Sequence, residues 1–129
     1  MIKVVVGIIE KDGKVLIARR VTDDPLKGRW EFPGGKVEKK ESPRNALKRE
    51  LQEELGITAD IGKCISCSTY DYGHILIELS AYRVSRVSGD IQSDEYQNII
   101  WVDKKDLGGL DFPEANTPII NTLQRESRR

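Results

Sequence analysis

The sequence is poor in the residues that build zinc sites and disulfide frameworks. Among its 129 residues there are two cysteines and a single histidine, His74. Cys64 and Cys67 form a C-x-x-C, but the second pair that a zinc site would need is missing. The surrounding pattern is that of a strand, in which side chains three positions apart are expected on opposite faces. We therefore interpret both cysteines as free thiols, typical of a reducing cytoplasm.

The chain also lacks net charge and long apolar runs. Its 21 Lys and Arg residues balance 21 Asp and Glu residues, which argues against stable binding to nucleic acid through a basic surface. The apolar N-terminal run is short and charged residues follow it at once, unlike a signal peptide. No run approaches the length of a membrane span. We expect one domain over residues 1–129, located in the cytoplasm, without a membrane partner.

The order of expected elements predicts a mixed architecture. Strands are indicated by apolar, β-branched or alternating runs at residues 3–9, 15–20, 57–70, 74–86 and 98–102. Asp12-Gly13 is a strong hairpin signal between the first two. A short helix from residue 103 is expected to break at Gly108-Gly109, and a C-terminal helix is expected within 113–129. Because strands and helices do not alternate regularly, we expect an α/β/α sandwich around a mixed β-sheet, of the α+β type.

A helix expected over residues 43–55 contains an acidic cluster. Ser42 is a suitable N-cap, and Gly56 lies where a C-terminal cap belongs. Three glutamates at i, i+3 and i+4 project from one face of this helix: Glu50, Glu53 and Glu54. Their mutual repulsion and the helix dipole both disfavour this placement. Bound Mg²⁺, or Mn²⁺ in its place, would offset both effects. The alternative is an ordinary solvated acidic face.

The spacing around the cluster resembles the signature of the Nudix family. Gly35, five residues, Glu41 and seven further residues lead into R-E-L-x-E-E-x-G-I at 49–57. This fills every specified position of the Nudix box, G-x5-E-x7-R-E-U-x-E-E-x-G-U, where U is bulky and apolar. The resemblance implies a hydrolase that cleaves nucleoside diphosphates linked to another group. It implies that the three glutamates and the carbonyl of Gly34 bind metal, with supporting roles for Gly35, Glu41, Arg49 and Gly56.

The resemblance leaves open which group takes the proton from the attacking water. Direct attack by water is the simpler scheme, because the sequence has no plausible Ser–His or Cys–His arrangement for a covalent intermediate. The candidate bases are Glu53 or Glu50 on the helix and Glu95 in a later segment. Glu95 is also a candidate metal ligand, and its alternative is an exposed loop acid. Arg49 lies four residues before Glu53, close enough to orient it.

A narrower resemblance, to the MutT-like branch, extends over nearly the whole chain. That branch cleaves nucleoside triphosphates, including 8-oxo-dGTP, to the monophosphate and pyrophosphate. The resemblance rests on residues 4–20, on WEFPGGKVE at 30–38, and on DFPEANTPII at 111–120, which resembles DFPPANEPVI. Glu114 departs from this pattern, which has a second proline there.

The branch implies which residues contact the nucleotide. Asn116 corresponds to the asparagine that reads the purine edge, with a side-chain amide that offers donor and acceptor together. Phe32 is expected at the base, and Arg20 is expected to line the nucleotide site. Each has an ordinary alternative: a helix cap for Asn116, a core residue for Phe32 and a solvated charge for Arg20.

Two further functions stay open. The first is hydrolysis of a pyrimidine triphosphate such as CTP or 5-methyl-dCTP. The second is a non-catalytic Nudix ligand-binding module, which would usually have a degraded signature or a fused domain. We expect a monomer or weak homodimer whose partner is its nucleoside triphosphate substrate.

Overall fold

The computed structural model describes residues 1–20, 28–91 and 96–127. The elements in these ranges are β1 (Ile2–Lys11), β2 (Lys14–Arg20), β3 (Trp30–Glu31), β4 (Gly34–Lys36), α1 (Pro43–Leu55), β5 (Thr58–Asp71), β6 (Leu76–Ser88), β7 (Tyr96–Asp103), the 3₁₀ helices η1 (Lys104–Gly109) and η2 (Glu114–Asn116), and α2 (Thr117–Ser127). Neither described α-helix is long and apolar enough to cross a membrane.

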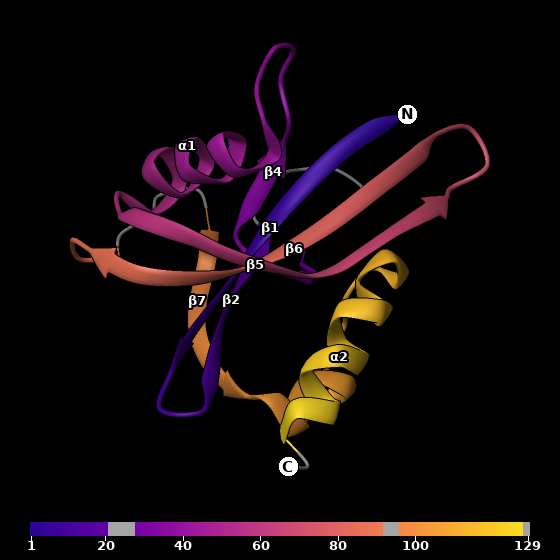
Figure 1. Ribbon diagram of the computed structural model, residues 1–129. Coiled ribbons are helices and arrows are strands. Elements are labelled where there is room, and N and C mark those ends of the chain that lie inside the picture. The colour runs from indigo at the N-terminus through magenta and orange to yellow at the C-terminus, as the bar shows by residue number, and fades with distance from the viewer. Residues whose placement is uncertain (21–27, 92–95, 128–129) are drawn as a thin grey trace.

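The strands form a mixed sheet in the order β3-β2-β1-β6-β5. β1 runs parallel to β6, with Ile2 opposite Ile77 and Ile9 opposite Val84, whereas β1 and β2 form the antiparallel hairpin that Asp12-Gly13 predicted. β4 also pairs with β1, and β7 pairs with β2. The two α-helices lie on opposite sides of this sheet (Figure 1). The predicted α/β/α sandwich around a mixed sheet is confirmed.

The central strand β1 is buried on both faces. Its Val5 and Ile9 belong to the core beneath α1, which contains the helix residues Ala46, Leu47, Leu51 and Leu55. Its Val6 and Ile8 belong to the core on the other face, which α2 covers with Ile119, Ile120 and Leu123. Successive strand side chains point to opposite faces, so an unbroken apolar run supplies both cores at once.

Helix α1 begins and ends where its caps predicted. The Ser42 Oγ accepts a hydrogen bond from the amide of Asn45 at 3.2 Å, which satisfies one of the free N–H groups of the first turn. At the other end, Gly56 adopts the left-handed conformation, with φ of 68°, and its amide donates to the carbonyl of Gln52 at 3.0 Å. Glycine adopts this conformation without a steric penalty.

The prediction that Cys64 and Cys67 point to opposite faces is wrong. The pairing of β5 with β6 shifts by one residue between Cys64 and Ser66, so that Cys64 lies opposite Tyr82 and Cys67 opposite Ser80. Tyr82 and Ser80 are two positions apart and therefore share a face. The register shift is a β-bulge, and its one extra residue places both cysteines on that face. Both are free thiols, as predicted.

A network of charges joins the end of α2 to the sheet. Arg83 on β6 is paired with Glu10 on β1 and with Glu126 on α2. Lys104 Nζ lies 2.8 Å from an oxygen of Glu10 and 3.2 Å from one of Glu126. Two cations and two anions thus alternate across β1, β6, η1 and α2, and α2 is held at both its apolar face and its C-terminal turn.

The core contact of α1 gives a stability prediction. Leu51 is fully buried between the helix and the sheet, so Leu51→Ala is expected to leave a cavity and lower the free energy of unfolding by about 2–5 kcal/mol. Urea denaturation followed by circular dichroism measures this. Lys48→Ala, at an exposed position of the same helix, is the control and should change the free energy by no more than about 0.5 kcal/mol. Equal losses in the two variants would contradict this packing.

Candidate functional site

Two glycines allow strand β4 to lie unusually close to its neighbours. Gly34 pairs with Val6 and Gly35 with Val5 on β1. A Cβ at Gly34 would lie 2.0 Å from the carbonyl oxygen of Val5, and one at Gly35 would lie 2.4 Å from Cδ of Glu50. Backbone atoms block a side chain at Gly34, and a side chain at Gly35 would displace the Glu50 carboxylate. The glycine pair therefore brings the strand backbone against the first glutamate of the acidic cluster.

One guanidinium group joins the strand, the loop and the helix of this segment. Arg49 Nε and Nη2 donate to the two carboxylate oxygens of Glu41, at 2.8 and 3.0 Å. Its Nη1 donates to Glu50 at 2.8 Å and to Glu53 at 3.2 Å. Its Nη2 also donates to the carbonyl of Lys36 at 3.1 Å. The planar fork of arginine suits this set of acceptors, which the single ammonium of lysine could not match.

These contacts hold Arg49 and Glu41 in their charged forms. Hydrogen bonding to Glu41 raises the pKa of Arg49 above its ordinary value, against the opposing effect of burial. The pKa of Glu41 is lowered, first by the hydrogen bond from Arg49 and second by the amide of Glu38, which donates to Glu41 Oε1 at 3.1 Å. The loop and the helix are therefore joined by an ion pair that persists at neutral pH.

The three clustered glutamates lie in different surroundings. The Glu50 side chain is 16 % exposed and the Glu53 side chain 58 %, and both contact Arg49, whereas Glu54 faces a pocket. Within residues 1–20, 28–91 and 96–127, no group of three or more His, Cys, Asp or Glu side chains is arranged to hold a metal ion. Glu50 lies beside Gly35, and Glu54 lines the same pocket as Gly34. Carboxylate and carbonyl oxygens are nevertheless the hard donors that Mg²⁺ and Mn²⁺ prefer. The donor set fits such a cation, and the role of each ligand stays a prediction.

A pocket of about 370 Å³ adjoins the acidic helix; we call it the central pocket. It is lined by Val4, Val6, Glu31, Phe32, Gly34, Gly35, Lys36, Glu54, Tyr72, Ile77, Leu79, Pro113, Ala115 and Asn116. The glycine pair and Glu54 supply a polar side, and the sheet supplies an apolar floor. Its volume and its mixture of apolar walls with a few polar groups are typical of small-molecule sites.

The structure brings Phe32 and Asn116 together in the central pocket. Phe32 is 2 % exposed and stacks on Phe112 with ring centroids 5.1 Å apart, so it is a core residue that also lines the pocket. Asn116 is 8 % exposed, and its Nδ2 donates to the carbonyl of Pro113 at 3.2 Å. It lies in η2, just before α2 begins at Thr117.

Two predicted site residues cannot be placed in this way. Glu95 lies outside the described residues, and Arg20 ends β2 with a side chain that is also outside them. Conversely, sequence reasoning missed Tyr72 and Lys36, which both line the central pocket. Tyr72 is 37 % exposed and stands in the turn after β5. An aromatic side chain in a polar turn was the available signal for it.

The sequence and the fold of this chain are similar to those of known proteins. A family profile described as the NUDIX domain matches residues 4–122. The chain is 40% identical over 123 residues to a CTP pyrophosphohydrolase of Escherichia coli strain K12, covering 95% of this chain and 91% of that one. It is 37% identical over 125 residues to an 8-oxo-dGTP diphosphatase of the same organism, covering 96% and 97%. The solution structure of the E. coli ORF135 protein superposes with a TM-score of 0.89 at 38% identity, over 98% of this chain and 91% of that chain.

The Arg49–Glu41 pair predicts how stability depends on pH. Because the pKa of Glu41 is lowered in the folded protein, its stabilising effect is complete above the ordinary value of 4.5 and is lost as the pH falls through the lower folded value. Glu41→Gln should therefore be less stable than wild type at pH 7, and the difference should shrink toward pH 3. Urea denaturation of wild type and Glu41→Gln from pH 7 to pH 3, without added divalent cations, measures this difference in stability.

Glu38→Gln is the matched control. The Glu38 side chain is 69 % exposed and lies 3.8 Å from Arg49, so this variant should follow the wild-type pH profile. A constant difference between wild type and Glu41→Gln across the whole range would contradict the assignment.

Proposed function

Since the chain belongs to the Nudix domain family, whose members hydrolyse phosphoric anhydride bonds and generally need a divalent cation, we propose that it hydrolyses 8-oxo-dGTP or a related oxidised dNTP. The products are the monophosphate and pyrophosphate, and the role is sanitation of the nucleotide pool. The observation that supports this is the central pocket, whose lining includes Asn116 and Phe32 together with Gly34, Gly35 and Glu54 of the acidic segment. Asn116 and Phe32 would suit a base, and the acidic segment with its cation would suit a phosphate chain.

The proposed metal ligands are the carboxylates of Glu50, Glu53 and Glu54 and the carbonyl of Gly34, with Glu95 as a further ligand. Mg²⁺ is the proposed cation and Mn²⁺ its substitute; when bound, it offsets phosphate charge, polarises the scissile bridge and lowers the pKa of a bound water.

Arg49 orients the carboxylates that we propose to act on the attacking water. Arg49 Nη1 contacts Glu50 Oε1 and Glu53 Oε2 and so fixes the direction of both carboxylates. We propose that Glu53 accepts the proton of the attacking water, with Glu50 and Glu95 as the other candidates. No covalent intermediate is needed, because the water attacks phosphorus directly.

We propose that Asn116 reads the base. A side-chain amide has two N–H donors and a carbonyl acceptor, and the bond to Pro113 uses one donor. Phe32 would contact the base, and Arg20 would line the nucleotide site. The proposed enzyme works as a monomer or weak homodimer in the cytoplasm, where its substrates occur and where thiols such as Cys64 stay reduced.

A pyrimidine triphosphate is the second candidate substrate. The relative that is 40% identical is a CTP pyrophosphohydrolase, and the same box would serve either nucleotide. Asn116 in its DFPEAN context favours the oxidised purine. A ligand-binding module without catalysis is disfavoured by the complete box.

Loss of one box carboxylate tests the catalytic proposal. Glu53→Gln keeps the size of the side chain but removes its charge and basicity, and it is expected to lower kcat by about 10²-fold or more while circular dichroism stays unchanged. Pyrophosphate release with Mg²⁺ measures it. Asp60→Asn, an exposed carboxylate on β5, should retain wild-type turnover. Full activity of Glu53→Gln would refute its assignment.

A nucleotide panel tests the base. Pyrophosphate release is compared for 8-oxo-dGTP, dGTP, CTP and 5-methyl-dCTP, in wild type and in Asn116→Ala. The sanitising role predicts that kcat/KM for 8-oxo-dGTP exceeds that for dGTP by at least about tenfold, roughly 1.4 kcal/mol of discrimination. Asn116→Ala should reduce that ratio. A wild-type preference for CTP would replace the purine with the second candidate.

A further inference from the structure

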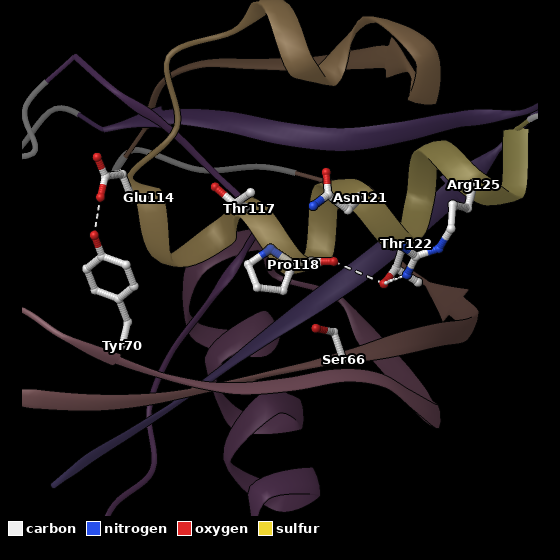
Figure 2. Close-up of a pocket in the computed structure, with 8 residues that line it drawn as sticks. All are labelled: Ser66, Tyr70, Glu114, Thr117, Pro118, Asn121, Thr122 and Arg125. Atoms are coloured by element: carbon white, nitrogen blue, oxygen red, sulfur yellow. Dashed lines mark hydrogen bonds between the residues drawn. The ribbon is translucent and has the colours of Figure 1, made fainter.

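Two segments that form walls of the central pocket are also joined outside it. The turn after β5 supplies Tyr72 to the pocket, and the η2 segment supplies Asn116. Tyr70, at the end of β5 and two residues before Tyr72, and Glu114 of η2 line a second hollow of about 700 Å³. It lies between β5 and α2, and we call it the outer groove. There the Tyr70 hydroxyl donates a hydrogen bond to the Glu114 carboxylate, as Figure 2 shows.

We infer that the Tyr70–Glu114 hydrogen bond is a positioning contact that fixes the two walls of the central pocket relative to each other, and so contributes to selection of the base without touching it. This inference rests on the proposed function of the pocket. Neither Tyr70 nor Glu114 is among the residues that line the central pocket.

The covalent and packing contacts explain how an outer bond acts on the inner walls. Glu114 stands between Pro113 and Ala115, which both line the central pocket, and two residues before Asn116. On the other side, the Tyr70 and Tyr72 rings pack with centroids 4.6 Å apart and planes at 54°. A movement of either outer side chain is therefore transmitted to an inner one through a short chain segment or a ring contact.

The η2 turn needs such a contact because of its own sequence. It contains three residues, of which Ala115 and Asn116 are buried. The backbone amide and the Nδ2 of Asn116 both donate to the Pro113 carbonyl, at 3.0 and 3.2 Å, and no such bond between described residues involves the Glu114 side chain within the turn. The related pattern DFPPAN has proline where this chain has Glu114. Proline fixes φ near its ring-determined value, which glutamate does not. The side-chain bond to Tyr70 replaces backbone stiffness with a tether across the fold.

The chemistry of the pair suits a tether at neutral pH. The hydrogen bond to Glu114, followed by partial burial, raises the pKa of Tyr70 above its ordinary value, so the hydroxyl stays protonated and remains the donor. Because the hydrogen bond itself is exposed to solvent, water competes for it. The effect of breaking it is therefore expected in binding and selectivity, at a few-fold, and not in the chemical step.

Steady-state kinetics of Tyr70→Phe and Glu114→Ala test this. Each is expected to raise KM for the preferred triphosphate by about threefold to tenfold, to reduce discrimination between oxidised and ordinary bases, and to leave kcat within about twofold. The double variant should be no worse than either single variant, because both remove one interaction. Glu114→Gln keeps an acceptor oxygen and should retain most of the wild-type selectivity.

Tyr82→Phe is the matched control, since Tyr82 is a half-buried tyrosine on β6 that faces Arg44 of α1; it should match wild type. Additive effects of Tyr70→Phe and Glu114→Ala, or unchanged KM and selectivity in both, would overturn the inference.

A structural readout separates this inference from the proposed function. In ¹⁵N NMR spectra of the whole chain, Tyr70→Phe should shift the Asn116 side-chain amide and the Tyr72 backbone amide, whereas Tyr82→Phe should not. If wild type hydrolyses none of the triphosphates, the proposed function fails. The positioning contact fails separately if the Asn116 and Tyr72 signals do not move.

Discussion

The contacts of the Arg49 guanidinium group hold the acidic segment together. Three glutamates within five residues of a helix end repel one another and lie at the unfavourable end of the helix dipole. Arg49 offsets part of that repulsion by contacting Glu50 and Glu53, and it fixes the preceding loop through both oxygens of Glu41. The cluster is therefore tolerated before any cation arrives. Cation binding would then redistribute charge within an existing arrangement instead of having to assemble one.

The site is rigid because it is mounted on the most buried strand of the sheet. β1 contributes side chains to both cores, so it cannot shift toward either helix without opening a cavity. Gly34 and Gly35 allow β4 to lie directly against this strand and against Glu50. The backbone beside the carboxylates is thus fixed by main-chain pairing, while the carboxylates themselves are fixed by Arg49. Two independent constraints meet at one place, which is what a precise binding site requires.

Local signals predicted the helices better than the details of the strands. Ser42 and Gly56 define α1 because capping depends on a few adjacent residues, and the box glutamates were identifiable because their spacing is fixed within that helix. The bulge near Cys64 depends on how β5 pairs with β6, so no local pattern of β5 reveals it. The Tyr70–Glu114 bond joins residues 44 positions apart, and the sequence marked only Glu114, as a departure from a pattern.

The residues proposed for chemistry and those proposed for base selection lie on different elements of this fold. The box occupies β4, α1 and the loop between them, whereas η2 and the turn after β5 supply other residues to the lining of the central pocket. A CTP pyrophosphohydrolase and an 8-oxo-dGTP diphosphatase each align with more than nine-tenths of this chain. Relatives whose names specify different bases thus share nearly the whole length of this chain, which is consistent with selection by the few residues that we propose to face the base. In this chain η2 contains glutamate where the related pattern has proline, and Glu114 accepts a hydrogen bond from Tyr70. Under the inference drawn above, the position of Asn116 would then depend on this side-chain contact as well as on the backbone.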